Sequence, residues 1–202
     1  MQFITDVTTN LTIDANFSTK RVTWKAGAEA DVGPDSLVYA NISTGFKSGG
    51  VNQVPNVPGY QTSYEPETIT AYQLGSKNRL VDRRMTLNAE VFYYDYRNFQ
   101  ALDVHVDPTG VIPGFFLQTA NSQKASMYGG ELEATVALSR DDRLSLTGTW
   151  LHARFDKFLL GGADLSGNQI QAAPDFTVQG SFEHTFHLAG GERLTAGVNS
   201  KW

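Results

Sequence analysis

The chain is 202 residues long and has a formal net charge of −5; its residues are 41% hydrophobic, with 19 glycines and no cysteine. The lack of cysteine excludes a disulfide framework, a cysteine zinc site and a cysteine nucleophile, and the acidic balance argues against nucleic acid as a partner. No apolar run approaches the ~18 residues that a membrane helix needs. The first ten residues, MQFITDVTTN, lack the basic and apolar regions of a signal peptide, and we expect residues 1–19 to be a loop or poorly ordered.

Apolar and polar residues alternate along most of the remaining chain, which predicts β-strands. In residues 22–32, every even position is Val, Trp or Ala, while the odd positions include Thr, Lys, Glu and Asp. The same alternation recurs in residues 176–186, and no strong helical period is present. We therefore predict an all-β, antiparallel protein of about eight strands. Their expected positions are 20–32, 35–46, 67–77, 84–97, 124–138, 143–155, 174–188 and 192–202.

Short and long connections alternate between these strands. VGPDS, NRLVDRR, SRDDR and LAGGER are short, polar turns, whereas residues 47–66, 98–123 and 156–173 are long and contain Gly, Pro, Asn and aromatic residues. Outer-membrane barrels have short periplasmic turns and long extracellular loops in this order. The pattern therefore predicts a segment of an antiparallel transmembrane β-barrel whose strands are connected as a meander.

The side chains on the apolar strand faces favour lipid over a packed core. These faces contain many small residues and no Lys, Arg, Asp or Glu, whereas a soluble core needs bulky side chains to fill it. Aromatic residues gather toward the strand ends, as expected of the belts that mark membrane interfaces. The belt residues are expected to be Tyr39, Tyr72, Phe92, Tyr93, Tyr94, Tyr96, Phe99, Tyr128, Trp150, Phe155 and Trp202.

Five segments together resemble the barrel of TonB-dependent outer-membrane receptors. In chain order they are LVYANISTGFKSGGVN, YEPETITAYQLGSKNRL, LNAEVFYYDYRNFQ, TANSQKASMYGGELEATV and LSGNQIQAAPDFTVQGSFEH. In the family, the second segment has a Pro-Glu pair, a Tyr, Glu-Leu-Gly and a Lys. Here Pro66, Tyr72, Gly75 and Lys77 match, and Gln73 replaces the acidic residue, which keeps a hydrogen-bonding role in the lumen but removes the charge.

This resemblance implies a fold, a location and partners. Family members are 22-stranded barrels plugged by an N-terminal domain, and they import iron–siderophore complexes, vitamin B12 or other scarce ligands with energy from TonB. We accordingly expect residues 1–202 to be a partial receptor barrel in the outer membrane of a Gram-negative bacterium. Its partners would be membrane lipid, a small ligand such as an iron siderophore, and the TonB complex through a plug domain that this sequence does not match.

Candidate ligand contacts are aromatic and polar residues of the long connections. They are Phe46, Lys47, Tyr60, Tyr64, Phe99, Phe115 and Phe116. We predict no catalytic, cofactor or metal site. Asp103, His105 and Asp107 stand at alternate positions and could share a strand face, but a solvated loop edge is the favoured interpretation. Glu131 and Glu133 also share a face, where charged residues are the expected lining of a water-filled lumen.

Two other functions remain open at this point. Eight strands can close into a small barrel, so the chain could be a self-contained scaffold, adhesin or outer-membrane enzyme. A soluble β-sandwich that binds a ligand is the third possibility. Backbone pairing between residues 20–32 and 192–202 would indicate a closed barrel. For a segment of a larger barrel we instead expect an open sheet with those two strands unpaired to each other and both chain ends on the outer side.

Overall fold

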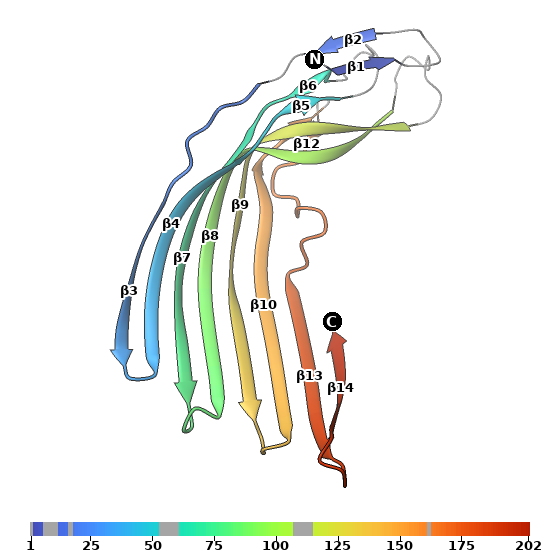
Figure 1. Cartoon of the computed structure of the whole chain (residues 1–202). Helices are drawn as coiled ribbons and strands as arrows, with labels where there is room; N and C mark the ends of the chain where they lie inside the picture. The colour runs from blue at the N-terminus through green and yellow to red at the C-terminus, as the bar shows by residue number, and fades with distance from the viewer. Residues whose placement is uncertain (1, 6–11, 16–17, 53–60, 107–114, 161–162) are drawn as a thin grey trace.

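The computed structural model of the chain describes residues 2–5, 12–15, 18–52, 61–106, 115–160 and 163–202, with side chains from Ser18 onward except at 105–106 and 115–116. Its main feature is one antiparallel sheet of eight long strands (Figure 1). The strands are β3 (Lys25–Gly33), β4 (Ser36–Lys47), β7 (Glu67–Leu80), β8 (Met85–Val106), β9 (Phe115–Ala137), β10 (Asp142–Lys157), β13 (Phe176–His187) and β14 (Arg193–Lys201). The all-β prediction and the number of long strands are confirmed. In the described residues no helix is long and apolar enough to cross a membrane.

The sheet is an open meander. Each long strand pairs with its neighbours in chain order, from β3 at one edge to β14 at the other. These two edge strands do not pair with each other among the described residues, so the interpretation as a closed eight-stranded barrel is wrong. Among the described residues, the other sheets have only two strands each, which contradicts the sandwich. β3 runs down into a turn and β14 runs up out of one, as predicted (Figure 1).

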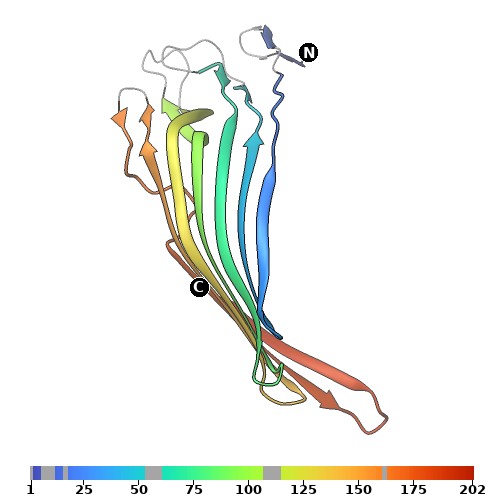
Figure 2. The same cartoon turned by 90° about the vertical axis from the view of Figure 1, so that its left-hand side faces the viewer.

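Three short strand pairs lie beyond one end of the sheet (Figures 1 and 2). They are β1 (Gln2–Thr5) with β2 (Thr12–Ala15), β5 (Gly50–Val51) with β6 (Ser63–Tyr64), and β11 (Leu159–Leu160) with β12 (Ala163–Asp164). The strands β1 and β2 lie within residues 1–19, which we expected to be a loop or poorly ordered. We call this end of the molecule, with the long connections, the loop end, and the opposite end, with the short turns, the turn end.

The hairpin of β8 and β9 is longer than predicted. We expected a loop over residues 98–123, but β8 continues to Val106 and pairs with β9 from Phe115 onward. Asn98 interrupts the pattern because it has a positive φ of 53° and is skipped in the pairing, so that Arg97 faces Lys124 and Phe99 faces Ser122. Gln123, opposite Asn98, is skipped as well, so the register is kept, but Phe99 packs against Tyr96 and thus lies on the same face. This break in the alternation hides the rest of the strand from a pattern of period two.

The register places one polar and one apolar row side by side across the sheet. The apolar row contains Ala30, Val38, Ser76, Ala89, Leu132, Gly148 and Val178. The next row contains Glu29, Tyr39, Gly75, Glu90, Glu131, Thr149 and Thr177. The large side chains of the apolar row are exposed: Val178 is 50% and Leu132 is 51% exposed. Because an exposed apolar face of this size needs a covering, lipid is its natural surrounding.

The predicted aromatic belt is only half right. Tyr72, Tyr93, Tyr128 and Trp150 lie on the apolar face, where neighbouring rings contact one another: the centroids of Tyr128 and Trp150 are 5.9 Å apart. Trp202 pairs through its backbone with Val178 and so stands in the apolar row as well. The other six members lie on the opposite, polar face: Tyr39, Phe92, Tyr94, Tyr96, Phe99 and Phe155. The position of a ring near a strand end does not reveal which face of the sheet it occupies. The rings on the polar face therefore cannot belong to a belt that faces lipid.

Candidate ligand-binding site

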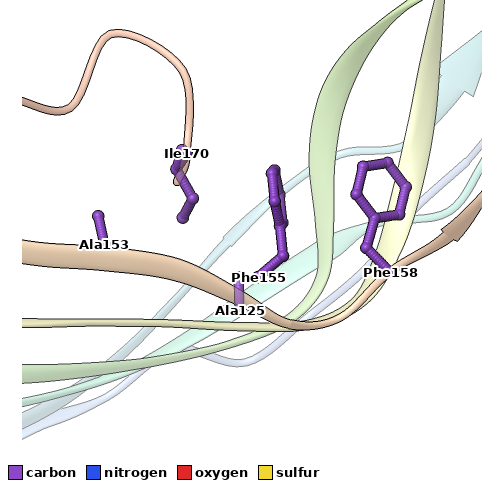
Figure 3. Close-up of a cluster of buried hydrophobic side chains, with 5 residues drawn as sticks. All are labelled: Ala125, Ala153, Phe155, Phe158 and Ile170. Carbon is purple, nitrogen blue, oxygen red and sulfur yellow. The ribbon is translucent and has the colours of Figure 1, made fainter. Parts of the chain in front are cut away.

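A cluster of buried apolar side chains lies at the loop end of the polar face. It consists of Ala125, Ala153, Phe155, Phe158 and Ile170 (Figure 3). Phe155 and Phe158 are 6% and 4% exposed, and their ring centroids lie 4.8 Å apart. The cluster brings together the end of β10 and the connection that follows it.

The connection after β10 folds back because the upper edge of β10 is free. β13 pairs with β10 only from Asp142 to Trp150, so beyond Trp150 β10 keeps its partner β9 on one edge but has no β13 partner on the other. Residues 165–170 take that place: the Phe155 amide donates to the carbonyl of Asn168 (3.0 Å), and the Ile170 amide donates to that of Ala153 (3.1 Å). This pairing carries Ile170 onto Ala153 and Phe155 (Figure 3).

A compact turn sets the direction of the returning segment. The Phe158 amide donates to the hydroxyl of Ser166 (3.1 Å), and the Gly167 amide donates to the carbonyl of Phe155 (2.7 Å). Gly167 has a φ of 83°, a conformation that residues with a Cβ rarely adopt. The hydroxyl and then the backbone amide of Ser166 donate to Asp164 and hold the pKa of that carboxyl below its usual value.

The extended part of β8 forms the opposite wall of a pocket of about 560 Å³. The ring of Phe99 meets Phe155 edge to face, with centroids 5.8 Å apart, and Tyr96 supports Phe99 from the other side at 5.3 Å. The pocket is lined by Phe99, Gln100, Ala101, Leu102, Asp103, Val104, Phe155, Phe158, Leu160, Leu165, Asn168, Gln169, Ile170, Gln171 and Ala172. Aromatic and aliphatic surface with a few polar groups is the usual lining of a small-molecule site.

The connection between β4 and β7 braces this wall from outside. The amide group of Asn52, a buried side chain, donates to the Thr119 carbonyl (2.9 Å) and accepts from the Thr119 amide (2.8 Å). Gln118 is 2% exposed, accepts from the Gln61 amide and donates to the Asp103 carboxylate (2.6 Å). These hydrogen bonds hold the β8–β9 hairpin and fix the position of Asp103 in the pocket.

A second polar site lies midway down the polar face. The Tyr39 hydroxyl donates to Glu90 (2.6 Å), and the Gln73 amide group donates to the other oxygen of Glu90 (2.8 Å). The ammonium group of Lys77 lies 5.6 Å from the centre of the Tyr39 ring. Gln73 therefore makes a hydrogen bond on the polar face, as predicted, and its role in a lumen stays a prediction. These residues border an open, polar hollow of about 630 Å³ that is shaped to meet water or a polar surface.

Gly75 is the residue that lets this network form. It stands opposite Tyr39 in the register, and a Cβ built at Gly75 would collide with the Tyr39 ring. Glycine at this place lets the aromatic ring lie flat over the neighbouring strand and reach Glu90. The glycine of the motif therefore has a packing role that its position in the sequence did not disclose.

The predicted contact residues do not gather at one place. Phe99 lines the pocket, whereas Phe46, Lys47 and Tyr64 are outside its lining: Phe46 faces Thr68, Lys47 faces Glu67 and Tyr64 faces Gly50. Tyr60 lies outside the described residues. Phe115 and Phe116 belong to β9, but their side chains are not described. Ligand binding by these seven residues stays a prediction.

Sequence reasoning missed most of the pocket. Phe158, Leu160, Leu165 and Ile170 come from a connection that its glycines mark as a plain loop. The large apolar residues of that loop could have indicated a packed or ligand-binding segment, because a fully solvated loop rarely contains several of them.

The other sequence candidates are placed as follows. Asp103 accepts from Gln118; the side chain of His105 is not described, and Asp107 lies outside the described residues. No group of three potential metal ligands occurs in the described part of the chain. At the turn end, a ring nitrogen of His184 lies 2.7 Å from the Asp142 carboxylate, and a ring nitrogen of His187 lies 2.7 Å from that of Asp141.

Comparison with known proteins identifies the class. Residues 2–202 match the family model described as TonB dependent receptor-like, beta-barrel. The chain belongs to this family, and its sheet is a segment of that barrel.

Solved receptors share the fold. The siderophore receptor PiuA from Acinetobacter baumannii is 18% identical, with a TM-score of 0.67 over 96% of this chain and 28% of PiuA. The ferric yersiniabactin uptake receptor FyuA from Yersinia pestis is 17% identical, with a TM-score of 0.61 over 88% of this chain and 28% of FyuA. The copper transporter OprC is 15% identical, with a TM-score of 0.59 over 79% of this chain and 23% of OprC. The chain thus spans about a quarter of the receptors it matches.

Proposed function

We propose that residues 1–202 form part of the barrel domain of an outer-membrane receptor that takes up a scarce ligand, an iron–siderophore chelate being the favoured class. The family match and the siderophore receptors among the solved neighbours support this choice. Energy would come from TonB in a Gram-negative cell, through a plug domain that the barrel match over these residues does not include. The role is capture and passage of a ligand, without covalent chemistry.

One observation carries the proposal: the apolar aromatic pocket sits at the loop end of the polar face, on a wall whose other face is apolar. If lipid covers the apolar face, the polar face lines the lumen, and the loop end opens to the outside of the cell. The pocket of Phe99, Phe155 and Phe158 then lies where an incoming ligand first meets the barrel. The network of Tyr39, Gln73 and Glu90 lies further down the same path.

The residues predicted from sequence keep a place in this proposal. Phe99 contacts the ligand directly in the pocket. Phe46, Lys47, Tyr60, Tyr64, Phe115 and Phe116 remain candidates for contacts made after the loops rearrange around a ligand. Alanine at each of the seven positions, tested in the full-length receptor, would rank them, with Phe99→Ala expected to weaken binding most.

The test is a gene disruption in the native host. Cells without the receptor should lose growth on at least one ferric chelate supplied as the only iron source, and the intact gene should restore it. Radiolabelled iron uptake should depend on the proton gradient that drives TonB. Unchanged growth and uptake with every ferric chelate supplied would contradict the proposed function.

A further inference from the structure

The pocket at the loop end offers a ligand almost no charge. Among its lining residues Asp103 alone carries a formal charge, and all others are apolar, aromatic or carboxamide residues. The carboxamides are Gln100, Asn168, Gln169 and Gln171. Carboxamides donate and accept hydrogen bonds without adding charge, so the pocket can recognise polar groups on a ligand that is neutral.

The one charged group is negative and held in place. Gln118 donates to the Asp103 carboxylate at 2.6 Å, and Gln118 itself is buried and fixed by the Gln61 amide. Asp103 therefore cannot swing away from an arriving ligand without breaking a charge-assisted hydrogen bond. An anion that enters the pocket meets a fixed like charge in surroundings that screen it poorly.

Two basic side chains, Lys124 and Arg154, are paired with carboxylates outside the pocket. Lys124 lies 3.7 Å from both Asp95 and Asp156, and Arg154 lies 3.4 Å from Asp175. Neither Lys124 nor Arg154 lines the pocket. Protein sites for multiply charged anions use Arg and Lys for recognition, and that chemistry is missing from the described lining.

We infer, on the basis of the proposed function, that this pocket selects a neutral or cationic metal chelate with apolar surface and discriminates against an anionic one. Ferric iron bound by three hydroxamate groups forms a neutral complex, because each group contributes one negative charge and together they balance the charge of the metal. Ferric iron bound by three catecholate groups forms an anionic complex, because each group contributes two negative charges and together they exceed the charge of the metal. The pocket fits the hydroxamate type: its rings cover the apolar surface and its carboxamides meet the ligand's amide groups.

The first experiment measures binding to the full-length receptor. A neutral ferric trihydroxamate and an anionic ferric tricatecholate are titrated separately, and we expect the neutral chelate to bind at least about tenfold more tightly. Leu160→Ala should weaken that binding about tenfold because Leu160 lines the pocket. Leu159→Ala is the matched control: Leu159 is the neighbouring residue, is 52% exposed and lies outside the lining, so its substitution should leave affinity within about twofold.

Charge substitutions test discrimination separately from folding. Gln171 lines the pocket and is exposed, so a charge there needs no burial. Gln171→Lys should strengthen binding of the anionic chelate about tenfold and Gln171→Glu should weaken it, with the neutral chelate changed less than about twofold by either. Asp103→Asn keeps an acceptor for Gln118 and should also admit the anionic chelate.

The outcomes separate the two proposals. Tighter binding of the anionic chelate to the unchanged receptor, weakened by Leu160→Ala, would overturn the inference and leave the proposed function standing. Insensitivity of both chelates to Gln171→Lys, Gln171→Glu and Leu160→Ala would overturn the pocket as the selective site. If the folded receptor binds no metal chelate at all, the proposed function fails, and the inference fails with it.

Discussion

The wall of long strands and the loop end follow different rules. Along the wall, each residue's face is set by its position in a strand, so neighbouring rows from β3 to β13 are mostly apolar or mostly polar. At the loop end, segments far apart in sequence meet: Asn52 binds Thr119, and Ile170 packs on Ala153. The wall thus depends on local alternation, whereas the candidate ligand site depends on tertiary contacts that can differ between receptors sharing the wall.

A charge placed on the apolar face should have the largest effect on the wall and tests the assignment of its two faces. Val178→Arg places a cation in the apolar row, where Arg or Lys at mid-depth in a membrane costs about 2–4 kcal/mol. Thr177→Arg, one residue away, places the same charge on the polar face. We expect Val178→Arg to abolish most of the folded receptor in the outer membrane and Thr177→Arg to retain it, measured by heat-modifiable mobility on gels. Equal yields would refute the assigned faces.

Gly75→Ala should disturb the wall from its polar face. The added Cβ would meet the ring of Tyr39, which must move and lose its hydrogen bond to Glu90. Overpacking of this kind costs about 1–3 kcal/mol. Gly148→Ala is the matched control because a Cβ there meets nothing within 4 Å. Unfolding of the full-length receptor in denaturant and detergent should show lower stability for Gly75→Ala alone, and no difference between the variants would contradict the packing of Tyr39.

Asn52→Ala tests whether the loop end is braced independently of the wall. The substitution removes both hydrogen bonds to Thr119, at about 1–3 kcal/mol for the buried backbone groups left without a partner. We expect faster hydrogen exchange at residues 117–121 and in the pocket wall, with unchanged exchange in the middle of β9. Should exchange rise evenly along β9, the two regions would be one cooperative unit and the distinction would not hold.

His187→Ala should have the smallest effect. The pair of His187 and Asp141 is largely exposed at the turn end, and exposed ion pairs contribute about 0–1 kcal/mol. We expect assembly and ligand binding within the error of the parent receptor. A loss of binding here would show coupling between the turn end and the pocket that the contacts do not explain.

The sequence predicted the wall better than the site, for a physical reason. Strands such as β4 and β7 end close to the expected positions because their alternation is unbroken and polar turns bound them. The interruption at Asn98 hid the extension of β8 because Phe99 beyond it lies on the same face as Tyr96, which breaks the period of two. The partner of Gln73 was unknowable without the register that brings Glu90 beside it. Phe158 and Ile170 could be seen as misplaced apolar residues, but their meeting depends on a free edge of β10 that no local pattern records.

Accessibility along β13 in intact cells tests the central claim most directly. These residues contain no native cysteine, so Phe176→Cys, Thr177→Cys, Val178→Cys and Gln179→Cys can each be made in a full-length receptor from which any other cysteine has been removed. A membrane-impermeant, water-soluble thiol reagent should label positions 177 and 179 and leave 176 and 178 unlabelled, since the former face the lumen and the latter face lipid. Labelling without this alternation, or strongest at position 178, would contradict the account of a membrane wall with one lipid face and one water-filled face.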